Sequence, residues 1–292
     1  MKKTLALVLA VLMALCVLAA CGSEETAAAS TSTEAASAST EAENTATGKL
    51  AEIQNRGKLI VATDATWAPF EYIGENGNPS GSDMELAAYI AEQLGVELEI
   101  KNIAFDSIGA YLQSGEADLG LAAITATEER KETLDFSDPY IVAEQYIVVR
   151  ADDDSVTYFT DLDGKTIGAH LGTTGDFLVA DSIADGTIGN ATENQYKSLP
   201  DASLALVNGD LDAIVCDTVM AENLCTARGG AIKCFPVAYT DHEADIEPLC
   251  VAMAKGDAEL VAKINEIIKP VVEDGTYESW VVTHTEISTN LG

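Results

Sequence analysis

The chain has 292 residues, 47% of them hydrophobic, and its 48 acidic against 16 basic side chains give a formal net charge of −32. This length and apolar content suffice for two compact lobes with their own cores. So acidic a chain lacks the basic footprint of nucleic-acid binding, and an anionic membrane surface would repel it. We therefore expect no nucleic-acid partner and expect any membrane attachment to depend on a lipid.

The N-terminus has the features of a secretory signal. Two lysines precede a continuous apolar run that ends in small residues before Cys21. The end of the run, LAAC, resembles the bacterial lipobox, after which the cysteine is lipidated. We predict a signal peptide over residues 1–20 and a multiply acylated Cys21 carrying palmitate-like chains, because one chain anchors weakly. The alternative is a signal anchor retained as a membrane helix, for which the run is short.

Residues 23–48 contain almost no large apolar side chain. They cannot bury enough surface to offset the entropy lost on ordering. We therefore predict that the lipidated cysteine and a disordered tether occupy residues 21–49, with a reach of roughly 25–30 Å as a flexible coil. An Ala-rich helix is the alternative, and the density of Ser and Thr opposes it.

Four cysteines follow the tether: Cys216, Cys225, Cys234 and Cys250. Their spacing matches no zinc pattern, and we expect no metal or other cofactor. Cys225, at the end of an expected helix, and Cys234, in the next expected strand, are the best candidates for a disulfide outside the cytoplasm. Buried free thiols are the alternative.

From residue 57 short apolar runs alternate with segments of helical periodicity. Gly95 is a stop signal for the first long helix of this series. The alternation with short connections predicts an α/β sheet with a parallel component. The expected elements are a strand at 58–63, a helix at 83–95, a strand at 97–103, a helix at 105–115 and a strand at 118–124.

The same order restarts with a strand, a Gly-containing turn and a helix within residues 164–184. It continues through segments at 199–209, 210–217 and 231–239, and residues 247–275 then give one strand and a long amphipathic helix. Two such blocks and a return segment predict two lobes, with chain crossings near 140–144 and 247–251. The predicted boundaries are 50–140 plus 251–292 for lobe 1 and 141–250 for lobe 2. Ligands of such folds bind at the carboxyl ends of the strands, here in an inter-lobe cleft.

Arg130 is one of only four arginines, and it lies among glutamates in ATEERKETLDFSDPY, residues 126–140. A planar guanidinium is the best side-chain partner for a carboxylate, such as that of an amino-acid zwitterion. The alternative is an exposed arginine on a helix capped by Thr127.

Three further features are compatible with a cleft for a small zwitterion. In HLGTTG, residues 170–175, free N–H groups of Gly172, Thr173 and Thr174 would form an anion cradle. Asp217 directly follows an apolar strand, where it either caps the next helix or faces the cleft. Trp67 and Phe105 follow strands in loops, where they either cover the core or form apolar walls around a ligand.

Taken together, these stretches resemble the polar amino-acid solute-binding proteins of ABC importers, the bacterial solute-binding proteins of family 3. The most specific part is T-x-T-x-E-R-K followed by DFSDPY, joined by GKLIVATDATWAPFEY, DLDGKTIGAHLGTTG, DLDAIVCDT and VAMAKGDAELVAKIN. The likeness covers roughly residues 50 to 285. It implies an α/β, two-lobe periplasmic-binding-protein type II fold, with a mixed sheet flanked by helices in each lobe and a two-strand hinge.

The resemblance also implies how an amino acid is held. Arg130 corresponds to the arginine that takes the α-carboxylate, helped by the hydroxyl of Thr125 and the backbone N–H of Thr174. The α-ammonium is taken by the carbonyl of Ala123, where the family often has glycine, and by Asp217.

The remaining positions carried over from the family surround the ligand side chain. Trp67 and Phe105 correspond to aromatic walls, and Asp64 to a residue that commonly meets the side chain. His170 stands where relatives carry varied residues; it either tunes the pocket or lies on the surface. Because Asp64 would repel an acidic side chain, we expect a neutral polar or cationic amino acid, with cystine remaining open.

The function that follows is that of a monomeric, extracytoplasmic, lipid-anchored receptor that delivers an amino acid to an ABC permease. The ATPase must be a separate subunit, since the chain has no G-x-x-x-x-G-K-S/T loop. The alternatives are a cyclohexadienyl (prephenate or arogenate) dehydratase on the same fold, the binding domain of a lytic transglycosylase and the sensor domain of a receptor. We expect a binding protein rather than an enzyme.

Overall fold

A computed structural model describes residues 48–240 and 246–291. The predicted signal peptide, the lipidated Cys21 and the tether up to residue 47 lie outside the described residues. Within the described ranges, none of the helices is both long and apolar enough to cross a membrane.

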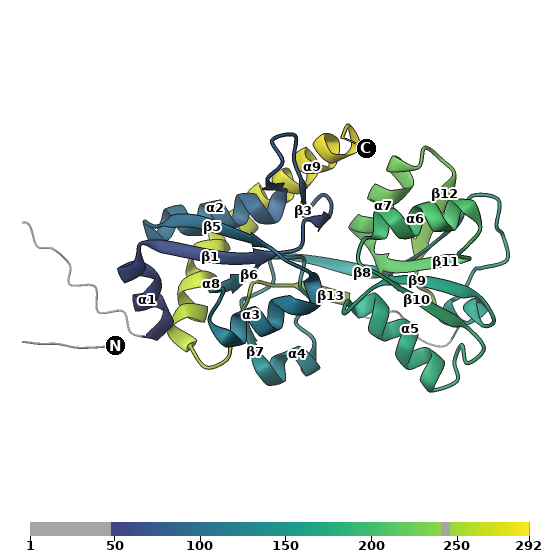
Figure 1. Cartoon of the computed structure of the whole chain (residues 1–292), viewed down its shortest axis with the longest axis horizontal. Helices are drawn as coiled ribbons and strands as arrows, with labels where there is room; N and C mark the ends of the chain where they lie inside the picture. The colour runs from purple at the N-terminus through teal and green to yellow at the C-terminus, as the bar shows by residue number, and fades with distance from the viewer. Residues whose placement is uncertain (1–47, 241–245, 292) are drawn as a thin grey trace, which may run out of the picture. The chain divides into compact units, whose positions relative to one another are not determined.

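The first sheet combines segments from both ends of the described chain (Figure 1). Its order is β5-β1-β6-β14-β7; β1 is parallel to β5 and β6, and β14 is antiparallel to β6 and β7. The predicted parallel component is therefore confirmed. The strands are β1 (Lys58–Thr63), β5 (Glu97–Asn102), β6 (Leu119–Gly120), β7 (Leu134–Phe136) and β14 (Ala252–Ala254).

Alternate side chains of β1 enter different cores. Leu59 and Val61 pack with α1, α2 and α8, whereas Ala62 packs with α3, as expected of a strand covered on both faces. At the end of α2, Gly95 has φ +70°, and the N–H of Val96 reaches back to the carbonyl of Ala91. The helices are α1 (Gly48–Arg56), α2 (Ser82–Leu94), the 3₁₀ turn η1 (Phe105–Ser107), α3 (Ile108–Ser114), α4 (Glu128–Thr133), α8 (Ala258–Glu273) and α9 (Thr276–Thr289).

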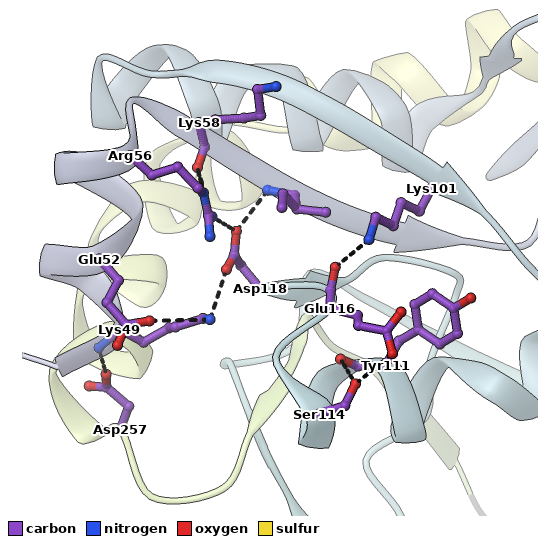
Figure 2. Close-up of polar contacts among 11 residues, drawn as sticks. Lys49, Glu52, Arg56, Lys58, Lys101, Tyr111, Ser114, Glu116, Asp118 and Asp257 are labelled. Carbon is purple, nitrogen blue, oxygen red and sulfur yellow. Dashed lines mark hydrogen bonds and ion pairs between the residues drawn. The ribbon is translucent and has the colours of Figure 1, made fainter. Parts of the chain in front are cut away.

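A buried carboxylate fastens α1 to this sheet (Figure 2). Nζ of Lys49 lies 3.2 Å from Oδ1 of Asp118, Nη2 of Arg56 contacts Oδ2, and the N–H of Ile60 donates to Oδ2 at 2.8 Å. Asp257 accepts from the backbone N–H of Lys49. The predicted tether end is thus corrected at residues 48 and 49, which are helical because these tertiary contacts hold them.

The second sheet has the order β10-β9-β11-β8-β12. β9 is parallel to β10 and β11, and β8 is antiparallel to β11 and β12. Val215 packs on the side of α5, whereas Ile214 and Cys216 pack with α6 and α7. The elements are β8 (Ile141–Arg150), η2 (Phe159–Leu162), β9 (Thr166–His170), α5 (Thr174–Ala184), β10 (Thr192–Tyr196), α6 (Leu199–Asn208), β11 (Ala213–Asp217), α7 (Thr218–Ala227) and β12 (Ile232–Pro236).

Two strands form a hinge between the sheets. β8 pairs with β13 (Ile246–Leu249) before it continues into the second sheet, and the chain after β13 enters β14 of the first (Figure 1). Both strands lie where the sequence places the two crossings. The exact domain boundaries, 140/141 and 250/251, stay a prediction.

The four downstream cysteines are free thiols. Cys225 in α7 and Cys234 in β12 interact as thiols, and this hydrogen bond raises the pKa of Cys225 and lowers that of Cys234. The predicted disulfide is therefore absent from this structure, and the free-thiol alternative is the one observed.

Several secondary-structure elements that depend on tertiary contacts were not predicted correctly from the local sequence. The expected strand 118–124 is a strand only at β6, because the chain turns at Ala123, where φ is +48°. Residues 247–275 contain two short strands before α8 where one was expected. The sequence also gave no sign of α9 or of a small antiparallel sheet made of β2 (Thr66–Trp67), β3 (Glu71–Ile73) and β4 (Pro79–Ser80).

Candidate functional site

The carboxyl ends of parallel strands from both lobes meet around one pocket. β1 ends beside Asp64, β9 at His170 and β11 at Asp217. The pocket has about 450 Å³ of space not filled by protein atoms, part of it open to solvent, within the usual range of small-molecule sites. All nine residues predicted to contact a ligand line it: Asp64, Trp67, Phe105, Ala123, Thr125, Arg130, His170, Thr174 and Asp217.

Arg130 is held in the pocket by its own helix and by the opposite lobe. Thr127 caps α4 by accepting from the N–H of Arg130 at 3.2 Å, as predicted. The guanidinium donates to the carbonyls of Thr125 at 2.8 Å and Gly172 at 2.9 Å, and it lies 5.4 Å from the ring centre of Phe105. Burial lowers its pKa to about 10, so it remains cationic at neutral pH. The exposed-arginine alternative is excluded by these contacts.

Asp217 both caps a helix and faces the pocket. Its Oδ1 accepts from the N–H of Met220 at 3.0 Å in the first turn of α7, and its Oδ2 accepts from the indole N–H of Trp67 at 2.6 Å. The sequence left open whether Asp217 caps a helix or faces the cleft. It does both, with one carboxyl oxygen for each. Burial raises the pKa of Asp217 to about 6, because the lost hydration outweighs the hydrogen bonds that it accepts from the protein.

Asp64 and His170 approach each other from opposite lobes. Oδ2 of Asp64 accepts from the N–H of Phe105 at 2.9 Å and lies 3.7 Å from Nε2 of His170. That nitrogen lies 3.0 Å from the carbonyl oxygen of Lys197, which assigns the ring proton to it. Burial raises the pKa of Asp64 and lowers that of His170. His170 is 3% exposed and stacks edge-on against Trp67, so the surface alternative is wrong.

The HLGTTG turn is less open than the sequence suggests. The N–H of Gly172 donates to Oδ2 of Asp176 at 2.8 Å, and that of Thr173 donates to the carbonyl of His170 at 3.1 Å. Two of the three predicted cradle donors are therefore used within the turn. Thr174 opens α5, where N–H groups of the first turn have no intrahelical acceptor.

Ala123 adopts a conformation that favours glycine. Its φ of +48° is the only positive φ of a non-glycine residue in the described ranges. Its N–H donates to Oδ2 of Asp83 at 3.0 Å, which fixes the turn. This backbone conformation is one that glycine adopts at no steric cost.

Four polar residues in the pocket were not predicted from the sequence: Thr66, Glu71, Gln145 and Glu247. Gln145 on β8 and Glu247 on β13 belong to the hinge, and the amide of Gln145 donates to Glu247 at 2.7 Å. Glu71 lies on β3, in the small sheet. The local sequence gave no signal for Gln145 and Glu247, because only the register of β8 with β13 brings them together. For Glu71 the APFE stretch gave a weak signal.

Several charged side chains surround the pocket. Carboxyl groups of Asp64, Glu71, Asp217 and Glu247 and one guanidinium surround the pocket. No group of three His, Cys, Asp or Glu side chains in the described residues is placed to hold a metal ion. A small molecule with a carboxylate and at least one positive charge matches these groups.

Two α/β lobes, a two-strand hinge and a pocket between the lobes at their strand ends define a type II periplasmic binding protein. The chain belongs to the bacterial extracellular solute-binding proteins, family 3, whose profile matches residues 59–284. It is 28% identical over 233 residues to the L-cystine-binding protein TcyJ of Escherichia coli K12, covering 80% of this chain and 84% of that protein. It is 32% identical to the arginine-binding extracellular protein ArtP of Bacillus subtilis 168, covering 76% and 83%.

Solved structures agree with this family. The amino acid ABC transporter substrate-binding protein AbpA of Streptococcus pneumoniae, bound to L-arginine, has a TM-score of 0.74 at 29% identity and covers 82% of this chain and 99% of that one. The ancestral amino acid-binding protein AncCDT-1, a precursor of cyclohexadienyl dehydratase, has a TM-score of 0.71 at 34% identity, covering 80% and 100%. The similar curated proteins reported above are binding proteins, although a dehydratase lineage shares the fold.

Proposed function

We propose that this chain is an extracytoplasmic receptor that binds an amino acid between its lobes and delivers it to an ABC permease. The observation that carries the proposal is the placement of Arg130 and Asp217 on opposite lobes around one pocket. Arg130 would take the α-carboxylate and Asp217 the α-ammonium of the same molecule. A ligand that joins the lobes in this way stabilises the closed arrangement over an open one.

The other predicted residues complete this arrangement in the proposal. Thr125, the N–H of Thr174 and the carbonyl of Ala123 would contact the ends of the zwitterion. Trp67 and Phe105 would enclose its aliphatic part, with Asp64 and His170 near the side chain.

The side chain of the ligand would be neutral and polar or cationic. The four carboxyl groups around the pocket oppose an acidic side chain. Relatives are described as binding arginine, histidine or cystine, and each of these ligands satisfies this condition.

Attachment to the membrane would occur through acylated Cys21. A net charge of −32 disfavours electrostatic binding to anionic lipid, so the acyl chains would supply the affinity. Mass spectrometry of the protein from its native membrane should find an acylated N-terminal cysteine, and Cys21→Ala should release the protein into the soluble fraction. An unmodified cysteine in the mature protein would refute the anchor.

Calorimetric titration tests the binding function. Residues 22–292, freed of bound ligand by unfolding and refolding, would be titrated with the twenty amino acids, ornithine and cystine. We expect one-to-one binding that requires both the α-carboxylate and the α-ammonium. A folded protein that binds none of them, or that converts prephenate or arogenate, would support the dehydratase alternative instead.

A further inference from the structure

Glu71 is a buried carboxyl group in the pocket to which no amide, hydroxyl or cationic group of the described chain donates a hydrogen bond. Its residue is 0% exposed, and in the described ranges neither of its oxygens accepts a hydrogen bond from an amide, hydroxyl, ammonium or guanidinium group. It nevertheless lines the same pocket as Arg130 and Asp217. Because burying a carboxyl without donors is unfavourable, its position calls for a specific explanation.

The groups around Glu71 are acidic or phenolic. Besides burial, repulsion from Asp83 of α2, and less strongly from Asp64 and Asp217 on the two lobes, raises the pKa of Glu71. The phenols of Tyr140 and Tyr277 also face this cluster but donate to Asp83, at 2.9 and 2.6 Å.

Asp83 and Glu71 are therefore unequal. Asp83 accepts three hydrogen bonds, from the two tyrosines and from the N–H of Ala123 at 3.0 Å. These donors favour its ionised form over that of Glu71. The two carboxyl groups interact directly, and such a contact is a hydrogen bond only when one of them carries a proton. The pKa of Glu71 is well above its usual value. Burial is the main cause, and repulsion from Asp83 is the second.

Glu71 is also placed beside an aromatic wall. In the small sheet it lies directly opposite Trp67, in register with it, so both side chains extend from the same face of the ribbon. A cation between an indole face and a carboxylate gains from both groups. Of the two basic side chains that line the pocket, Arg130 already donates to two carbonyls and His170 is held neutral.

We propose that Glu71 determines specificity: it shares a proton with Asp83 until a positively charged ligand side chain replaces that proton, so that the site selects a cationic amino acid. This inference rests on the proposed function above. On binding, the proton leaves the Glu71–Asp83 pair for solvent, and Glu71 becomes the carboxylate that faces the ligand cation. The site would therefore favour arginine over its neutral analogue of the same length, citrulline.

Calorimetry with these two ligands tests the proposal. Both carry the same α-carboxylate and α-ammonium, so the contributions of Arg130 and Asp217 cancel in the difference between them. In the chain from residue 22 we expect arginine to bind about 10- to 100-fold more tightly than citrulline. Titrations in buffers of different ionisation enthalpy should show that arginine releases about one proton more than citrulline. The arginine affinity should weaken relative to that of citrulline as the pH falls.

Variants assign the effect to Glu71. Glu71→Gln should reduce the preference for arginine to less than about threefold and abolish the extra proton, while citrulline still binds. Glu75→Gln removes the same charge at an exposed position in the turn between β3 and β4, and it should behave as wild type. If Glu71→Gln does not fold, the proton count of the wild-type protein still tests the proposal.

Each result has a definite meaning. Equal affinities and equal proton release for the two ligands would overturn this inference and leave the proposed amino-acid binding intact. Persistence of the arginine preference in Glu71→Gln would also overturn it and move the role to Asp64. Failure of every amino acid to bind would instead refute the proposed function itself.

Discussion

Replacement of Arg130 by lysine separates the charge of this residue from its geometry. The guanidinium has five N–H groups, and two of them are used on the carbonyls of Thr125 and Gly172. The remaining three allow a bidentate pair with a ligand carboxylate. A lysine ammonium that kept both carbonyl contacts would have only one N–H left for the ligand.

The expected loss follows from that count. One hydrogen bond to a charged group is worth about 1.5–3 kcal/mol, so Arg130→Lys should weaken amino-acid binding by about 10- to 150-fold. Arg130→Ala removes both ligand bonds and should weaken binding by about 10²- to 10⁴-fold. The free energy of unfolding should change far less than the binding free energy in both variants.

Calorimetry for affinity and urea unfolding for stability would measure the two quantities. Arg150→Lys is the matched control: Arg150 donates to the carbonyl of Leu211 at 2.7 Å but does not line the pocket. It should affect stability alone. If Arg130→Lys binds within about threefold of wild type, whereas the full effect expected is larger, the bidentate role of Arg130 is refuted. A large stability loss without an affinity change would make Arg130 a structural residue.

Three other predictions follow from the geometry. Burial raises the pKa of Asp217 to about 6, so the unliganded site gains a proton as the pH falls through that value. Affinity for a neutral amino acid should then fall by up to about tenfold per pH unit, and Asp217→Asn should bind weakly with a flat profile. Asp118→Asn should destabilise the fold by about 1–3 kcal/mol in urea unfolding, since two cations lose a buried partner; Glu99→Gln, at a surface pair, should change little. Ala123→Gly should stabilise by up to about 1 kcal/mol by thermal unfolding, because φ is +48° there, whereas Ala122→Gly should not.

Elements with strong local periodicity were predictable. The strand at 58–63 matches β1, and the helix at 83–95 matches α2 to within one residue at each end. Elements that depend on distant partners were not. β6 is shorter than its apolar run because residues beyond Gly120 turn toward the pocket, and α1 is fixed at its start by Asp118 and Asp257.

The candidate site divides in the same way. The sequence, through its resemblance to the family, predicted that Arg130, Asp217 and seven other residues contact a ligand in one inter-lobe cleft, and strand ends are where ligands of such folds bind. Only the tertiary structure decided which neighbours share that pocket. The hinge register brings in Gln145 and Glu247, and the small sheet places Glu71 against Asp83. Burial, and with it the protonation of these carboxyl groups, depends on packing between segments far apart in the chain, which local sequence does not encode.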